Sequence, residues 1–360
     1  MKKPRARELG IPLPGETGRH NAITDVPGVR VGFSTVVDES RGIRTGVTAI
    51  LPREDEGKPQ PVWAGQATLN GNGEMTGTHW IHDAGYFVGP VCITNTHSLG
   101  IVHHAATRWI IDCYDSAFEE HHLWAMPVVA ETYDGVLNDI NGQHVTGEHA
   151  REALEQAKGG PVAEGGVGGG AGMIAYEFKG GTGTSSRRVR FDGEDFTVAA
   201  LVQANHGIRD WLTVCGVPVG REMQEHRLLE EEQGSIIVIL ATDAPLGPLT
   251  LRHLARRASI GIGRGGTPGG NNSGDIFLAF SVAEPTDLPQ VAPLRRTSTT
   301  FTGEQIDPIY LAGVEAVEEA VLNAMLAGET VPTFKPSGHE CHAIDAERLM
   351  ELLNRRGIDF

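Results

Sequence analysis

Short apolar runs separated by polar and glycine-rich stretches characterise the chain. The clearest run, residues 236–241, has no polar alternation, is rich in β-branched residues and ends at Thr242 and Asp243. A run of this kind is typical of a strand that is covered on both faces. Other runs predict a turn and strand within 21–34, a strand beginning at 62–65, and strands at 43–51, 87–96, 127–132, 171–178, 187–191, 195–203 and 276–281.

Helical patterns lie between these strands. Ile101, Ala105, Trp109 and Cys113 recur at helical spacing and predict a helix over 98–118. Further helices are expected at 147–158, 249–260, 307–328 and 345–353, whereas 66–78, rich in Gly, Asn and Thr, is expected to be a loop and 220–233 a charged linker. Mixed strands and helices with doubly covered strands indicate an α+β fold with stacked sheets between helices. We find no repeat and no domain linker, so 1–360 is expected to form a single domain.

The junction Gly234-Ser235 stands directly before the apolar run. A Gly-Ser pair at the start of a strand is ordinarily a turn. The alternative is that Ser235 attacks the carbonyl carbon of Gly234, cuts the chain and becomes a new N-terminal nucleophile. A Ser hydroxyl needs an adjacent base, and a freed α-amine, with a pKa of about 7.7–8.0, could serve as one.

The composition of the chain excludes some classes of function. The chain has 360 residues, of which 40% are hydrophobic and 21% charged, as in globular proteins, and its net charge is −16. The negative charge argues against non-specific binding to nucleic acid or anionic membranes. No apolar run is long enough to span a membrane, no signal peptide is recognised, and the four dispersed cysteines suit a reducing compartment, so we expect a cytoplasmic protein.

Several strand ends carry polar side chains that could support chemistry. Ser273 and Asp275 are two apart at the mouth of a strand and should point the same way, although a strand-capping turn is the simpler interpretation. Asn205 ends another strand and could donate to an oxyanion, or be an ordinary turn residue. Glu131 and Tyr133 close a third strand end, where they could bind an amine and donate a hydrogen bond, or be a solvated loop pair.

Two further patterns are weaker. The glycine run at 165–172 lacks the Gly-Lys-Ser/Thr ending of a phosphate-binding loop, and a strand is expected after it, which disfavours a nucleotide site. The histidines are not accompanied by an HExxH motif or by carboxylates at ligand spacing, so no metal and no cofactor is expected.

Several segments together resemble one known family. They are residues 21–32, 131–135, 202–205, 234–238 with 241–246, and 273–281. In combination they are similar to the DmpA-type L-aminopeptidase/D-esterase and β-aminopeptidase family, and the likeness runs in order along almost the whole chain.

The resemblance implies an α-β-β-α sandwich, like that of N-terminal-nucleophile hydrolases but with different strand connectivity. It implies self-cleavage into 1–234 and 235–360, with Ser235 as nucleophile. Matched by motif, Ser273 and Asp275 would orient and activate Ser235, and Asn205 would stabilise the oxyanion. Glu131 would hold the free amine of a small peptide, amide or ester substrate, and Tyr133 would lie near the scissile carbonyl. Family members need no metal and assemble as homo-oligomers of the cut heterodimer.

Two alternatives remain at this point. An acyltransferase on the same fold, of the self-cleaving ornithine acetyltransferase type, would transfer the acyl group to an amine, although that type is expected to use Thr where this junction has Ser235. An uncut binding protein without catalytic activity would keep the fold alone. The acidic run Glu230-Glu231-Glu232 before the junction leaves the rate of self-cleavage open.

Overall fold

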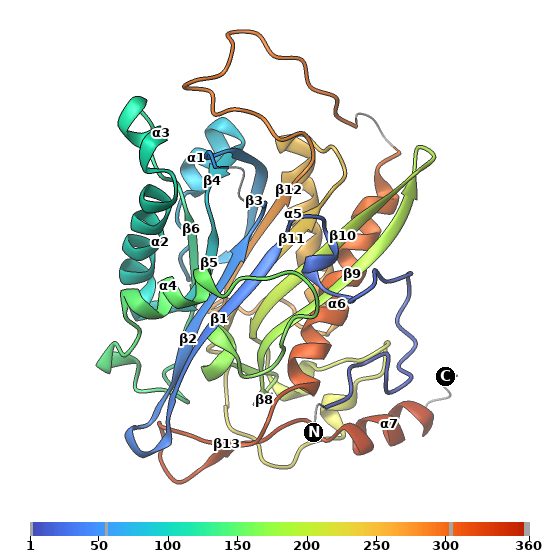
Figure 1. Cartoon of the computed structure of the whole chain (residues 1–360). Helices are drawn as coiled ribbons and strands as arrows, with labels where there is room; N and C mark the ends of the chain where they lie inside the picture. The colour runs from blue at the N-terminus through green and yellow to red at the C-terminus, as the bar shows by residue number, and fades with distance from the viewer. Residues whose placement is uncertain (1–2, 55–56, 302–304, 356–360) are drawn as a thin grey trace.

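Two β-sheets are stacked face to face and covered on their outer faces by helices (Figure 1). The structure, a computed structural model, describes residues 3–54, 57–301 and 305–355. In the view of Figure 1 the helices α2 and α4 lie on the left of the sheets, and α5 and α6 on the right. The predicted arrangement of stacked sheets between helices is confirmed.

The first sheet has four strands. Its order is β1 (Arg30–Asp38), β2 (Ile43–Leu51), β5 (Val91–Asn95) and β6 (Val128–Thr132), antiparallel except for the parallel pair β5–β6. Its outer face packs against α2 (Leu99–Cys113) and α4 (Gly147–Glu155) through buried residues such as Val102, Ala106 and Leu154.

The second sheet has six strands. Its order is β4 (Tyr86–Val88), β3 (Pro61–Gly71), β12 (Gly274–Ser281), β11 (Ser235–Thr242), β10 (Glu194–Asn205) and β9 (Gly181–Phe191). Helix α5 (Pro248–Arg264) connects β11 to β12, and only this pair in the sheet is parallel, as a helical crossover requires. Together with α6 (Asp307–Leu326), α5 covers the outer face.

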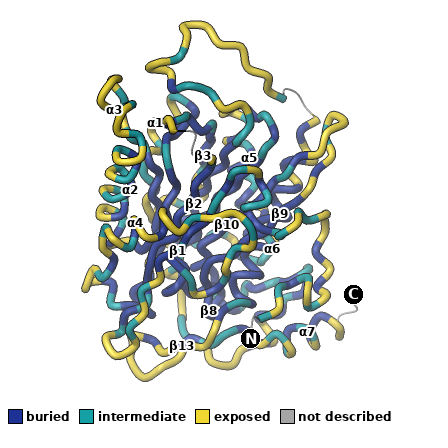
Figure 2. The backbone as a smooth tube through the Cα atoms, viewed as in Figure 1, coloured by how far each residue is buried: buried dark blue, intermediate teal, exposed yellow. Residues whose placement is uncertain are grey.

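Alternating side chains of β11 fill both faces of this second sheet. Ile237 and Ile239 lie between the sheets, whereas Ile236, Val238 and Leu240 pack against the helices, and all five are fully buried. Dark blue, the colour of buried residues, dominates the centre of the molecule in Figure 2. Burial on both faces explains why the run shows no polar alternation.

Smaller elements complete the chain. Helices α1 (Thr78–Ala84), α3 (Asp115–Glu120) and α7 (Ala346–Arg355) lie at the periphery, with the short strand pairs β7 (Ile174–Ala175) and β8 (Phe178–Lys179), and β13 (Val331–Pro332) and β14 (Glu340–Cys341). None of the helices in the described ranges combines the length and apolar character needed to cross a membrane.

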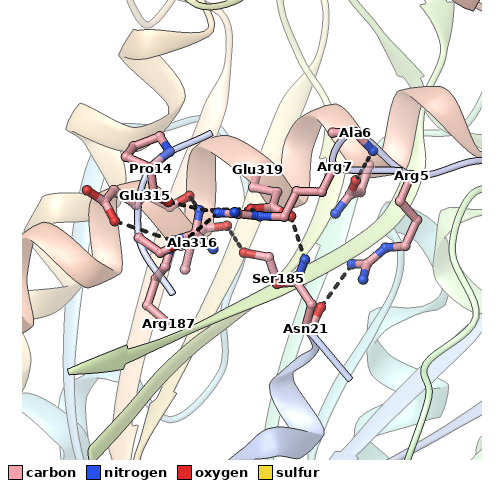
Figure 3. Close-up of polar contacts among 12 residues, drawn as sticks. Arg5, Ala6, Arg7, Pro14, Asn21, Ser185, Arg187, Glu315, Ala316 and Glu319 are labelled. Carbon is pink, nitrogen blue, oxygen red and sulfur yellow. Dashed lines mark hydrogen bonds and ion pairs between the residues drawn. The ribbon is translucent and has the colours of Figure 1, made fainter. Parts of the chain in front are cut away.

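The N-terminal segment is fastened to β9 and α6 by a buried ionic network (Figure 3). Glu319 of α6 accepts hydrogen bonds from Arg187 at 2.8 Å and from Arg7 at 2.9 Å, and also from Asn21. The Arg187 side chain is 1% exposed and also pairs with Glu315. Removing one member would leave a buried charge without its partner, so these residues act as a unit.

Several predicted elements differ from the structure. The single strand expected at 87–96 is divided into β4 and β5, which belong to different sheets. Residues 66–71, expected to be loop, extend β3, because they pair with β12 as in Thr68↔Ile276 and Asn70↔Asp275. The strand expected at 171–178 is a 3₁₀ turn followed by β7 and β8, which are joined through left-handed Tyr176 and Glu177, with φ of 50° and 62°. The helix expected at 98–118 breaks at Tyr114, and α3 beyond it buries no residue against the sheets.

Candidate active site

Ser235 is the first residue of β11, where it lies between β10 and β12. It pairs with Asn205 in the antiparallel ladder and with Gly274 in the parallel one. Strand alternation gives Ser235 the same face as Ile237, so its side chain belongs to the layer between the two sheets. Ser235 is 5% exposed, and within the described residues no hydrogen bond engages its hydroxyl. The hydroxyl is therefore buried and uncommitted.

Gly234 lies directly against the end of β10. A Cβ added to Gly234 would lie 1.8 Å from the backbone oxygen of Asn205 and 3.0 Å from the Cα of His206. No side chain fits in this space, so the close approach of the two backbones requires glycine. The peptide bond between Gly234 and Ser235 is thus held against the strand that ends in Asn205.

Asn205 is anchored by both ends of its amide. Its Oδ1 accepts from the backbone N–H of Ile174 at 2.8 Å, and its Nδ2 donates to the backbone oxygen of Tyr133 at 2.9 Å. An amide nitrogen carries two hydrogens, so one N–H remains for another acceptor. Asn205 and Ser235 share the layer between the sheets, which brings this donor and the hydroxyl to the same edge.

Ser273 and Asp275 form a hydrogen-bonded pair, as their spacing predicts. The Ser273 hydroxyl donates to Asp275 Oδ1 at 2.6 Å, and Asn70 Nδ2 donates to Oδ2 at 3.2 Å. Burial raises the pKa of Asp275, while hydrogen bonds from Ser273, Asn70 and the backbone of Ile236 lower it. Because Asp275 accepts from the backbone of Ile236, and Ser235 pairs with Gly274, the pair lies beside the Ser235–Ile236 backbone.

Glu131 lies in β6, and Tyr133 is the first residue after this strand. Glu131 is 4% exposed and accepts hydrogen bonds from the backbone N–H of Glu74 at 2.8 Å and from the hydroxyl of Thr96. Burial raises the pKa of this carboxyl, an effect that the hydrogen bond from Thr96 opposes. Tyr133 is 44% exposed, and its hydroxyl folds over Gly135, so only its backbone oxygen joins the Asn205 cluster.

Gly73 and Gly274 lie between Glu131 and the Gly234-Ser235 junction. A Cβ on Gly73 would lie 3.2 Å from Glu131 Oε1 and 3.6 Å from the Cα of Gly274, which is the ladder partner of Ser235. The Glu131 carboxylate and the strand pair that carries Ser235 therefore lie on neighbouring segments, which pack closely because residues 73 and 274 have no side chain.

Two cavities border this region. One of about 30 Å³ is lined by Tyr133, Asn205, Gln233 and Gly234 among others, and has room for little more than one water molecule. An open groove of about 570 Å³ begins at Gly73, Glu74 and Ile276 and extends along α1 to His79 and His82. The intact segment before Ser235 thus fills the space next to Asn205, while a groove remains open on the side of Glu131.

Two polar residues at the site, the half-buried Asn70 and the buried Glu232, are missed by sequence reasoning. Asn70 lies in the segment expected to be loop, although its alternation with Thr68 could have indicated a strand end. Glu232 belongs to the acidic run expected to be a solvated linker, but it is 7% exposed. Among the described residues, no group of three or more His, Cys, Asp or Glu side chains is arranged to hold a metal ion.

Solved structures share this architecture over the whole chain. The L-aminopeptidase D-Ala-esterase/amidase from Ochrobactrum anthropi matches with a TM-score of 0.95 and 56% identity over 99% of both chains. It is described as a prototype for the serine aminopeptidases and a new variant of the N-terminal-nucleophile hydrolase fold. A β-aminopeptidase from Burkholderia sp. matches with a TM-score of 0.90 and 45% identity, over 98% of this chain and 99% of the other. The protein is thus a hydrolase with this variant fold, which confirms the predicted fold class.

Sequence comparison gives the family. The β-peptidyl aminopeptidase BapA of Sphingosinicella microcystinivorans is 47% identical over an alignment 350 residues long, which covers 91% of this chain and 87% of the relative. Residues 21–339 match Peptidase family S58. The chain belongs to peptidase family S58, and the predicted family and enzyme class are confirmed.

Proposed function

We propose that the protein is a serine aminopeptidase that matures by cutting its own chain between Gly234 and Ser235. The observation that carries the proposal is the junction itself. A buried, uncommitted hydroxyl follows a glycine that is held against the Asn205 strand end. The products would be 1–234 and 235–360, which remain together because β11 is a central strand of the sheet.

Self-cleavage proceeds in two steps. The Ser235 hydroxyl oxygen attacks the Gly234 carbonyl carbon and loses its proton, and the C–N bond breaks as the nitrogen of Ser235 takes up a proton. The resulting ester joins Gly234 to the Ser235 oxygen. Water then hydrolyses the ester, leaving a carboxylate on Gly234 and restoring the hydroxyl. The new α-amine, with a pKa of about 7.7–8.0, supplies the base that a serine nucleophile requires.

In the mature enzyme, Ser235 attacks the substrate carbonyl. The free N–H of Asn205 stabilises the tetrahedral oxyanion, a contribution of about 3–4 kcal/mol for comparable donors. Ser273 and Asp275 lie beside the backbone of Ser235 and Ile236, where the new amine is formed. They hold that amine and pass its proton to the leaving group. The backbone oxygen of Tyr133 accepts a hydrogen bond from Asn205, and its phenol would reach the scissile carbonyl after leaving its position over Gly135.

Glu131 selects substrates with a free N-terminal amine. Its buried carboxylate would gain a cationic partner from a substrate ammonium group, which a blocked substrate lacks. The groove that begins beside Gly73 and Ile276 would receive the substrate. The substrate class is therefore short peptides, amides or esters with a free amine, in keeping with the aminopeptidase relatives. We place the enzyme in the cytoplasm as a homo-oligomer of cut heterodimers.

Intact mass under denaturing conditions tests the proposal. We expect two species that sum to the full chain plus one water, with Ser235 at a new N-terminus. The Ser235→Ala variant should remain one chain without peptidase activity, whereas Ser116→Ala, at an exposed position, should behave as wild type. A cut and active Ser235→Ala protein would rule out Ser235 as the nucleophile. Acyl transfer to a small amine in preference to water would instead favour the acyltransferase alternative.

A further inference from the structure

Glu232 differs from its acidic neighbours in its burial. Glu230, Glu231 and Gln233 are exposed, whereas Glu232, three residues before Ser235, is 7% exposed. Burying a carboxylate is costly unless it gains specific partners. Glu232 is therefore expected to have contacts that its exposed neighbours lack.

The Glu232 carboxylate contacts two different loops. Its Oε1 accepts a hydrogen bond from the backbone N–H of Gly207 at 2.6 Å. Its Oε2 lies against Gly270, where an added Cβ would be only 1.8 Å away. The carboxylate thus fills the space between the loop after β10 and the loop before β12.

Both loops carry groups that the proposed mechanism uses. Gly207 is two residues beyond Asn205, and Gly270 is three residues before Ser273. The segment 232–234 is therefore held at both ends: Glu232 binds Gly207, and Gly234 lies against the Asn205 backbone. This arrangement leaves the Gly234 carbonyl little freedom relative to Ser235.

We propose that Glu232 is a positioning residue for self-cleavage, which fastens the segment before the cut to the loops that carry Asn205 and Ser273. The inference rests on the proposed self-cleavage. Glu232 acts through geometry, because holding the reacting atoms in place lowers the barrier to an intramolecular attack.

Pulse-labelled cell-free synthesis of the full chain tests the inference, because it follows the appearance of fragment 235–360 with time. We expect Glu232→Ala to slow cleavage at least about tenfold, as expected for loss of a hydrogen bond to a charged group. Glu232→Gln keeps an acceptor for Gly207 and should lie between Ala and wild type. Glu231→Ala removes a carboxylate one residue away and should cut at the wild-type rate. Melting temperatures of the purified variants establish that each is folded.

Gly270→Ala provides a second test of the contact between Glu232 and the loop before β12. Its added methyl group displaces the Glu232 carboxylate, so cleavage should slow in the wild-type background but change little further when combined with Glu232→Ala. Additive effects of the two changes, or a Glu232→Ala chain that is cut at the wild-type rate, would overturn the inference. A wild-type chain that stays whole would instead refute the proposed self-cleavage, and the inference with it.

Discussion

Ser235 and Asn205 are paired directly across the antiparallel ladder of β10 and β11, and both side chains belong to the layer between the sheets. The amide of Asn205 is fixed by Ile174 and Tyr133, while the Ser235 hydroxyl has no partner among the described residues. A rigid donor beside a free hydroxyl is the arrangement that acyl transfer requires, because the donor needs no reorganisation when charge develops on the oxygen.

Replacing Asn205 by Asp tests the oxyanion role. Aspartate keeps the acceptor for Ile174 but loses the N–H donor and adds a negative charge beside the developing oxyanion. We expect kcat to fall by about 10²–10³, and self-cleavage to slow as well. Time courses of fragment formation and steady-state kinetics of whatever material is cut measure the two effects. Retention of wild-type kcat by Asn205→Asp would remove Asn205 from the mechanism.

Replacing Glu131 by Gln tests amine selection. Activity on peptides with a free amine should fall about tenfold to a hundredfold, the range for losing a charged hydrogen bond. An ester with a blocked amine should lose far less, and it serves as the internal control. Equal losses on both substrates would contradict the proposed role of Glu131.

The pH profile provides an independent test of Glu131. Burial raises the pKa of this carboxyl, and only its ionised form attracts an ammonium group. As the pH falls, kcat/KM for free-amine substrates should therefore decline at a higher pH than an ordinary glutamate would produce. Asp275, whose pKa is also raised by burial, affects both substrate classes. The ratio of kcat/KM for the free-amine substrate to kcat/KM for the blocked ester therefore reports the ionisation of Glu131 alone. In Glu131→Gln this ratio should not change with pH.

Gly234→Ala tests the close approach at the cut. Its methyl group would lie 1.8 Å from the Asn205 oxygen, so the segment must shift away from β10. Displacement of the carbonyl by about 1 Å can cost a hundredfold in rate, and we expect self-cleavage to slow by that order. Gln233→Ala, at the exposed neighbouring position, should be cut normally. A Gly234→Ala chain cut as fast as wild type would mean that the backbone contact does not position the bond.

Local pattern was sufficient to predict the elements that surround the site. The unbroken run at 236–241 predicts a doubly covered strand, and β11 is buried on both faces. The two-residue spacing of Ser273 and Asp275 predicts side chains on one face, and they are hydrogen-bonded. In both cases the information lies within a few residues, where periodicity is a direct guide.

Contacts between distant segments could not be predicted in this way. The polar composition of 66–71 is typical of loops, yet pairing with β12, some 200 residues away, makes it strand. Glu232 has the sequence context of a solvated linker, and its burial depends on Gly207 and Gly270. The orientation of Tyr133 over Gly135 likewise follows from packing and not from pattern. Tertiary context overrides local preference at these positions.

His206, next to Asn205, is expected to make the fold sensitive to acid. Its ring is 1% exposed and lies edge-on to Tyr176 with ring centroids 5.1 Å apart, and neither ring nitrogen has a hydrogen-bond partner among the described residues. Burial lowers the pKa of His206 to about 3, from 6.5. Above pH 6.5 the imidazole is neutral in both the folded and the unfolded chain, so it contributes no pH dependence there.

Below pH 6.5 the unfolded chain binds a proton that the folded chain rejects until the pH approaches 3. The free energy of unfolding should therefore fall by about 2–3 kcal/mol between pH 6.5 and 4.5 through this residue alone. His206→Phe keeps the aromatic contact with Tyr176 and should lose that part of the pH dependence, whereas the same change at exposed His121 should leave it intact. Denaturant titrations at a series of pH values measure the difference between variant and wild type, and parallel curves for His206→Phe and wild type would show that the imidazole is protonated in the folded state.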